Sequence, residues 1–235
     1  MLDTGPRDPL FPRVAKAAGR RGRVLDVGSG PGRFVLPLAP RVASVTAVDP
    51  SEAMLRIVRR EARRRGLTNV TTVHSPWPQA EVEPVEVSLC SYVLPLIEEA
   101  APFLRRMDAV TTERAFVSFN AASFDLVFDT FWRHFHGSPR RPGPTYLDLV
   151  AVLRELGADP SVEVGRGPRT WRFRDLGAAV RTYREQLLLA DTPAVRRELK
   201  GLLADWLVAD GDGLVPPTGG LPTAVVSWVP TGVGR

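Results

Sequence analysis

The segment DVGSGPG, residues 26–32, combines residue types at a spacing that points to ligand chemistry. Its glycines stand at alternate positions, so the backbone around Gly28, Ser29 and Gly30 can turn sharply and approach a ligand with no Cβ in the way. The segment follows a short apolar run and opens a helical pattern, and the first N–H groups of a helix are free to face a ligand. Asp26 supplies a carboxylate that can attract an ammonium group. These features predict a nucleotide or nucleoside ligand that carries an amine.

A second acid, Asp49, ends the next apolar run about twenty residues further on, where a carboxylate can accept hydrogen bonds from both hydroxyls of a ribose. The alternative ligand is a dinucleotide, whose fingerprint requires a third glycine three positions after the second. That position holds Arg33, and the third glycine, Gly32, stands one position earlier. The spacing therefore weakens the interpretation as an NAD site and leaves a different ribose-containing ligand.

The strings VLDVGSGPGRF and VTAVDPSEAML together resemble the motifs of the class I S-adenosyl-L-methionine-dependent methyltransferase family. The resemblance covers roughly residues 24–119 and implies an enzyme that uses S-adenosyl-L-methionine as its methyl donor. Its implied contacts are Asp26, Gly28, Ser29 and Gly30 at the methionine half, Asp49 at the ribose, and Pro50 and Met54 at the edge of the adenine.

The sequence departs from the family pattern after the third expected strand, where His74 and Ser75 replace a common Gly-Asp pair. Ser75 could still accept a hydrogen bond from the adenine amine. Trp77 either stacks on the adenine or covers the core. After the fourth strand, Cys90 stands where the family contacts the methionine part, although a small buried hydrophobe is the favoured interpretation. Tyr92 follows at a position that contacts the acceptor in some members.

A sulfonium is already an activated methyl donor, so the protein must mainly align the acceptor and exclude water. A hydroxyl or phenol acceptor would benefit from a general base, and histidine is the usual choice. His134 and His136, in the string FWRHFHG, are the candidates, but their spacing does not let both face the same way on a helix. The alternative is that both are surface or interhelical residues. The three histidines and the single cysteine show no metal-ligand spacing, so we expect no metal.

Strand and helix patterns alternate through the first half of the chain, which predicts an α/β fold. We expect a Rossmann-like, seven-stranded, mostly parallel sheet with helices on both faces and a helical cap after the fifth strand. The expected domains are a cofactor-binding core over 1–120, a mainly helical cap and acceptor region over 121–220, and a final strand returning to the sheet over 221–235. Strands are expected at 24–27, 42–48, 70–73, 85–94, 115–119 and 225–229, and cap helices at 124–135, 146–156, 176–189 and 193–208.

The net charge of +5 comes almost entirely from arginine, because Lys16 and Lys200 are the only lysines. Arginine-rich faces could serve an RNA methyltransferase, one on the helix expected after Asp49 and another around Arg140 and Arg172. Charge runs on helices are more often solvated surface. A helical cap is typical of enzymes that enclose a small molecule, so we expect a small-molecule acceptor for O- or N-methylation and regard nucleic acid as the less favoured partner. A non-catalytic cofactor-binding protein remains a third hypothesis.

A single cysteine cannot form a disulfide framework, which favours a reducing cytoplasm. The sequence has no apolar stretch of membrane-spanning length, so we expect no membrane association. The oligomeric state is left open.

Overall fold

The computed structural model describes residues 8–121, 128–166, 171–217 and 221–232. The chain divides into two compact units, which we call the core unit and the helical unit. The core unit comprises Met1–Ala121, Pro144–Gly165 and Thr223–Arg235, and the helical unit comprises Ala122–Gly143 and Arg166–Pro222. The division expected from the sequence was wrong for residues 144–165, which were assigned to the cap but pack within the core unit.

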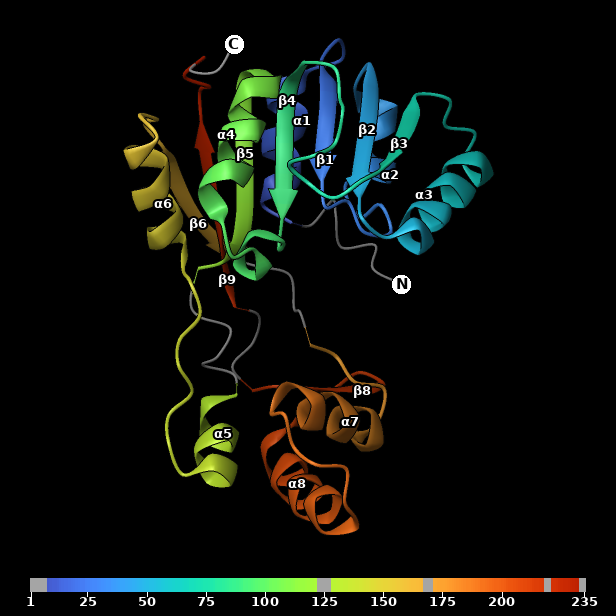
Figure 1. Cartoon of the computed structure of the whole chain (residues 1–235). Coiled ribbons are helices and arrows are strands. Elements are labelled where there is room, and N and C mark those ends of the chain that lie inside the picture. Colours follow the sequence, from blue (N-terminus) through green and yellow to red (C-terminus); the bar gives the residue numbers. More distant parts are fainter. Residues whose placement is uncertain (1–7, 122–127, 167–170, 218–220, 233–235) are drawn as a thin grey trace. The chain divides into compact units, whose positions relative to one another are not determined.

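A seven-stranded sheet forms the centre of the core unit, in the order β3-β2-β1-β4-β5-β9-β6 (Figure 1). The strands β1 to β5 pair in parallel, and β9 runs antiparallel to β5. This arrangement confirms the predicted Rossmann-like sheet. The strands are β1 (Arg23–Val27), β2 (Ser44–Asp49), β3 (Val70–His74), β4 (Val85–Ser91), β5 (Thr111–Asn120), β6 (Ser161–Arg166) and β9 (Pro222–Trp228).

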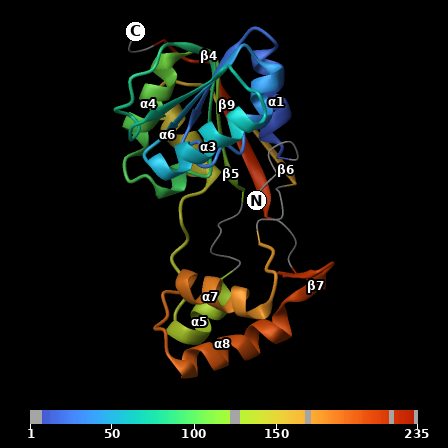
Figure 2. The same cartoon turned by 90° about the vertical axis from the view of Figure 1, so that its right-hand side faces the viewer.

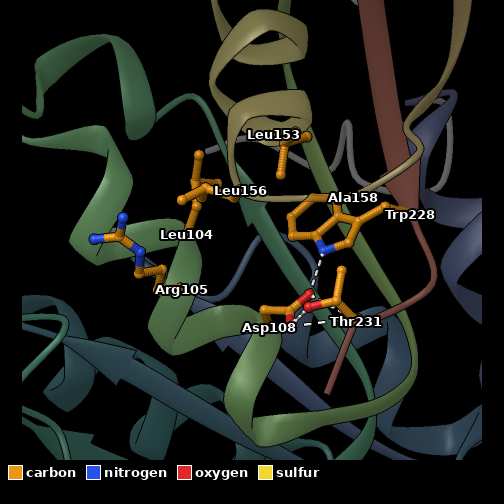
Figure 3. Close-up of a pocket in the computed structure, with 8 residues that line it drawn as sticks. All are labelled: Leu104, Arg105, Asp108, Leu153, Leu156, Ala158, Trp228 and Thr231. Atoms are coloured by element: carbon orange, nitrogen blue, oxygen red, sulfur yellow. Dashed lines mark hydrogen bonds between the residues drawn. The ribbon is translucent and has the colours of Figure 1, made fainter. Parts of the chain in front are cut away.

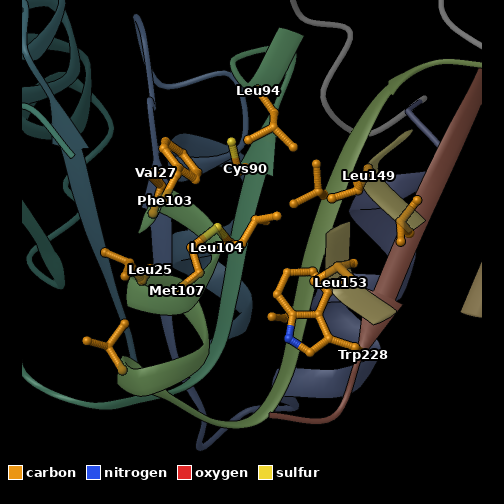
Figure 4. Close-up of a cluster of buried hydrophobic side chains, with 14 of the residues drawn as sticks. Leu25, Val27, Cys90, Leu94, Phe103, Leu104, Met107, Leu149, Leu153 and Trp228 are labelled. Carbon is orange, nitrogen blue, oxygen red and sulfur yellow. The ribbon is translucent and has the colours of Figure 1, made fainter. Parts of the chain in front are cut away.

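Helices cover both faces of this sheet (Figure 2). One buried cluster joins the sheet to α1 (Leu10–Ala18), α2 (Val35–Leu38) and α3 (Glu52–Arg64). The other joins it to α4 (Ala100–Val110) and α6 (Tyr146–Glu155), as Figure 4 shows. Successive side chains of a strand point to opposite faces, so Val24 belongs to the first cluster and Leu25 to the second.

The two helix-covered faces also explain why residues 144–165 belong to the core unit. In α6, Leu149 and Leu153 are 4% and 1% exposed, and they pack in the same cluster as α4. The apolar spacing along 146–156 predicted the helix, but it carried no information about which unit the helix covers. The following strand, β6, then occupies the edge of the sheet beside β9.

The helical unit has its own aromatic core around Tyr183, which is fully buried. The rings of Phe128 and Phe131 lie 4.9 and 5.3 Å from the Tyr183 ring, centroid to centroid. The buried residues of this core come from α5 (Asp129–His136), α7 (Leu176–Gln186), α8 (Pro193–Trp206) and the segments beside them. A hairpin of β7 (Val208–Asp210) and β8 (Gly213–Val215) follows, which the sequence analysis missed because each strand has only three residues.

A group of hydrogen bonds centred on Asp108 lies near the amino end of β5, at the opposite end of the sheet from the glycine segment (Figure 3). The carboxylate of Asp108, at the end of α4, accepts hydrogen bonds from the Trp228 indole at 2.9 Å and from the Thr231 backbone at 3.1 Å and its hydroxyl at 2.9 Å. The cavity beside it measures only about 50 Å³. We interpret this region as structural.

Candidate functional site

The glycine segment follows β1 as a tight bend, with φ angles of +72° at Gly28, +52° at Gly30 and +87° at Gly32. Residues with a Cβ rarely adopt these angles. A Cβ on Gly28 would also lie 2.4 Å from Cγ2 of Val93, the residue that follows Tyr92 after β4. A Cβ on Gly30 would meet nothing within 4 Å. The bend therefore packs tightly at Gly28 and leaves open space at Gly30.

The backbone N–H groups of Ser29 and of the glycines in this bend have acceptors within the fold. Those of Gly28 and Ser29 donate to the Val48 carbonyl at 2.9 and 3.0 Å, and that of Gly32 donates to the Ser29 carbonyl at 3.1 Å. The helix that follows, α2, has only four residues and continues as a 3₁₀ turn over Ala39–Arg41. The bend is thus held to β2 by its own backbone.

Asp49 lies against the bend, because β1 and β2 pair in parallel with Val27 opposite Val48. Its Oδ2 accepts the Gly30 N–H at 2.8 Å, and its Oδ1 accepts the Ser51 N–H at 2.8 Å. The side chain is buried, at 7% exposed. Each carboxylate oxygen has two acceptor positions, so one on each remains for a ligand. The ribose contact stays a prediction, and the structure adds a second task for Asp49, which is to orient the bend.

Asp26 is 2% exposed, and its Oδ2 has no hydrogen-bond partner. The hydroxyl of Ser29 is likewise buried without a partner. Burial, and next the charge of Asp49, raise the pKa of Asp26 to about 7, while Arg33 opposes that rise. A buried carboxylate that lacks a donor is costly, and a ligand ammonium would remove that cost. Asp26 therefore has the chemistry expected of a site for a cationic group.

Arg33 is a residue of this site that the sequence analysis treated only as a departure from the dinucleotide fingerprint. Its guanidinium forms an ion pair with Asp8, a residue 1% exposed, from the segment before α1. It lies 5.1 and 5.4 Å from the ring centroids of Phe34 and Tyr92, and its Nε is buried without a partner. Nothing local in the sequence signals the pairing, because Asp8 stands 25 residues away.

Tyr92 has a φ of +60°, unusual for a residue with a side chain, and its hydroxyl is hydrogen-bonded to that of Thr223 at 3.0 Å. Strain of this kind clusters at functional sites. Asn120, at the carboxyl end of β5, keeps a buried Oδ1 without a partner. The sequence analysis did not name Asn120 as a site residue, because burial of its amide is decided by the tertiary structure.

Other predicted cofactor contacts lie in different environments. Cys90 is fully buried in the core cluster of Figure 4, so its side chain offers no surface to a ligand, and burial raises the pKa of its thiol. The Trp77 indole donates to the Phe103 carbonyl at 3.0 Å and packs edge-on against that ring, which fits the covering role. The Ser75 hydroxyl donates to the Pro76 carbonyl at 3.1 Å. Pro50 and Met54 are both exposed at the start of α3.

Both candidate histidines lie in the helical unit, on α5. Nε2 of His134 is 2.7 Å from Oε1 of Glu198. Nε2 of His136 is 2.9 Å from the Leu187 carbonyl, and its ring stacks on Trp132 with centroids 4.1 Å apart. Both are thus held between helices, and His134 also lines an open groove of about 570 Å³ with Phe131 and Trp206. A catalytic role for either stays a prediction.

The described residues contain no cluster of three histidine, cysteine, aspartate or glutamate side chains placed to hold a metal ion. Within the same residues, no helix has the length and apolar character needed to cross a bilayer.

Part of the core unit is similar to known methyltransferases. Residues 24–114 match the family model described as "Methyltransferase domain". A putative methyltransferase from Bacillus halodurans superposes with a TM-score of 0.62 at 17% identity, covering 94% of this chain and 99% of that one. Magnesium protoporphyrin IX methyltransferase from Synechocystis, with bound S-adenosylhomocysteine, gives 0.56 at 22% identity over 66% of this chain and 72% of that one. Residues 24–114 are thus similar to the methyltransferase domain family, and the class I methyltransferase fold inferred from the two motifs is confirmed.

Curated relatives match parts of the chain. A ubiquinone biosynthesis O-methyltransferase from Methylocella silvestris is 33% identical over 168 residues, 65% of this chain and 63% of the relative. An rRNA uracil-C5-methyltransferase from Chromohalobacter salexigens is 52% identical over 48 residues, 20% of this chain and 10% of that protein. The chain spans 50–63% of the length of the first two curated relatives that it matches.

Proposed function

We propose that this protein is an S-adenosyl-L-methionine-dependent methyltransferase that acts on a small molecule. The observation that carries the proposal is the pair of buried acids at the glycine bend. Asp26 has an oxygen without a partner, and Asp49 is tied to Gly30 with acceptor capacity left over. The methyltransferase domain match over the same residues supports it.

The residues at the bend fit the donor's chemical groups. The donor's amino-acid end carries an ammonium, which Asp26 attracts, and the hydroxyl of Ser29 is a further unsatisfied group beside it. Asp49 accepts from the ribose while it holds the Gly30 N–H. When bound, the donor supplies a methyl group already activated by its sulfonium, so the protein needs no nucleophile of its own. What remains for the protein is to bind, to orient and to exclude water.

An RNA acceptor has weaker support. On α3, Arg59 pairs with Glu52, and Arg60 and Arg64 both approach Glu61, at 3.5 and 2.9 Å. In the helical unit, Arg172 pairs with Asp212 at 2.6 Å. Paired arginines release few counterions on meeting phosphate, so these faces have less affinity for nucleic acid than the arginine count implies. The similarity to the rRNA enzyme covers only 48 residues, 20% of this chain.

His134 is the stronger of the two candidate bases for a hydroxyl acceptor. It lines a groove and faces Glu198, whereas His136 is occupied by a backbone carbonyl and by Trp132. A carboxylate beside an imidazole orients the ring. For a hydroxyl acceptor, His134→Gln should lower kcat while leaving donor affinity unchanged.

Calorimetry tests the donor site directly. We expect S-adenosyl-L-methionine and S-adenosylhomocysteine to bind and NADH not to bind. Methylthioadenosine, which lacks the amino-acid part, serves as the matched ligand: Asp26→Asn should weaken binding of S-adenosylhomocysteine and leave methylthioadenosine unaffected. If neither sulfur nucleoside binds and NADH does, the proposal is overturned.

A further inference from the structure

A groove of about 220 Å³ opens at the carboxyl edge of the sheet, within the core unit. It is formed by the segment after β4, the start of α4, the end of β5 and the start of α6. Its apolar lining includes Leu94, Phe119, Leu149 and Val152. Leu94 and Leu149 also belong to the buried cluster of Figure 4, so the floor of the groove is part of the packed core.

The groove is connected to the donor site through consecutive residues. Val93 lies against Gly28 in the glycine bend, and the next residue, Leu94, lines the groove. Val93 and Leu94 follow β4, and β4 pairs in parallel with β1, which ends at the bend. A molecule in the groove would therefore lie beside the segment that contacts the donor site.

The charges around the groove have one sign. Its ionisable lining residues are Glu98 and Asp148, and its described lining contains no arginine, lysine or histidine. The Thr145 backbone N–H, hydrogen-bonded to Asp148 at 2.6 Å, lowers the pKa of that carboxyl, which keeps it ionised. Glu99, beside Glu98, is exposed and adds to the negative potential at the mouth.

The apolar surface extends beyond the groove itself. Leu96, on the segment after β4, is 81% exposed, and Leu147, in the first turn of α6, is 61% exposed. Each is next to residues that line the groove, so both enlarge the apolar area that an occupant can cover. Large apolar side chains at such exposure mark interaction surfaces when they gather at one place.

We infer that this groove binds the methyl acceptor and that the acceptor is an amine with an apolar body. The inference rests on the proposed function. The apolar lining removes a hydrocarbon or aromatic body from water. The two acids attract an amine and repel a carboxylate or a phosphate, because like charges at a partly desolvated site are unfavourable.

The chemistry of transfer is consistent with such an acceptor. The acids hold the ammonium form, which gives a proton to water before transfer. The lone pair of the resulting neutral amine forms the new N–C bond as the S–C bond of the donor breaks, and the electron pair of that bond stays on sulfur. The methylated nitrogen then carries one extra proton, which passes to water.

A matched pair of fluorescent ligands tests the charge preference: 2-(1-naphthyl)ethylamine and 1-naphthaleneacetate share one apolar body and differ in charge. We expect the amine to bind the full-length protein at least tenfold more tightly than the carboxylate. Glu98→Lys should reduce or reverse that ratio. Glu113→Lys, the same charge change at an exposed position near the amino end of β5, should leave it unchanged.

A second variant tests the place of binding. Ala100→Trp fills the groove from the first residue of α4 and should abolish binding of the amine, with thermal melting to confirm folding. Affinity for S-adenosylhomocysteine should stay the same in all three variants. Equal binding of the two ligands, or amine binding that survives Ala100→Trp in a folded protein, overturns the inference about the groove. Loss of S-adenosylhomocysteine binding by the unaltered protein overturns the proposed function instead.

Discussion

Asp26 and Asp108 are both buried acids of the core unit, at opposite ends of the sheet, and they differ in what surrounds them. Asp108 is 8% exposed, and its carboxylate is satisfied by Trp228 and Thr231 (Figure 3). Asp26 is 2% exposed and has an oxygen without a partner. A polar group that serves the fold is satisfied within the fold, whereas a group that serves a ligand is left unsatisfied until the ligand arrives. The difference separates a structural acid from a binding acid.

The largest expected effect is on Asp108. Asp108→Ala leaves the buried Trp228 indole without its acceptor and removes the hydrogen bonds to the exposed Thr231, which should lower the free energy of unfolding by about 3 kcal/mol. Denaturant unfolding measures the loss, and S-adenosylhomocysteine affinity should stay unchanged. Asp108→Asn keeps one acceptor oxygen and should recover part of the stability. A fall in ligand affinity without loss of stability would contradict the structural role.

The second prediction concerns pH and Asp26. Its folded pKa of about 7 lies above the ordinary value of an aspartate, so the folded state holds a proton that the unfolded state releases. Stability should therefore fall as pH rises from about 4 to 7 and stay level above 7. Relative to Asp26→Asn, the ligand-free protein should lose about 2–3 kcal/mol between pH 5 and pH 8.

Donor binding should show the opposite trend, because the donor's ammonium requires the ionised carboxylate. Affinity for S-adenosylhomocysteine should rise with pH up to 7 and then level off, and Asp26→Asn should remove the rise. Unfolding curves and calorimetry at the two pH values measure both trends. A flat profile in the unaltered protein contradicts the interpretation of Asp26 as the binding acid.

The third prediction tests whether Asp49 contributes to ligand binding. Asp49→Ala should weaken S-adenosylhomocysteine binding by about 1.5–3 kcal/mol, because it removes charge-assisted hydrogen bonds to the ribose and to the bend. Methylthioadenosine keeps the ribose and should lose a similar amount. Asp159→Ala, an exposed acid of the core unit, is the control and should change neither affinity. Unchanged affinity in Asp49→Ala rejects the ribose contact.

The smallest effect separates two glycines. Gly30→Ala and Gly66→Ala both place a Cβ at positive φ with no atom within 4 Å, so each should cost about 1 kcal/mol of stability. Gly30→Ala should also weaken S-adenosylhomocysteine binding, since its Cβ enters the open space at the bend. Gly66→Ala should leave that affinity unchanged. Equal affinities in the two variants would place the ligand elsewhere.

The sequence by itself determined the order of β1 to β5 and β9 along the chain, the glycine bend and the two acids that flank it, but it did not locate β6. These features are local, because apolar alternation and the backbone freedom of glycine act over a few residues. Local patterns also predicted α6, although not the unit that it covers. The sequence analysis missed β7 and β8, because strands of three residues are too short to show a pattern of apolar alternation.

Tertiary structure alone decided which polar groups are satisfied. The bend's N–H groups are taken by Val48 and Asp49, Arg33 is paired with the distant Asp8, and Asp26 is left with an unpartnered oxygen. Whether a hydrogen bond forms depends on atoms that the chain brings together from far apart in sequence. Burial of a charge, which moves the pKa of Asp26, is likewise a property of the packed core rather than of the residues beside it.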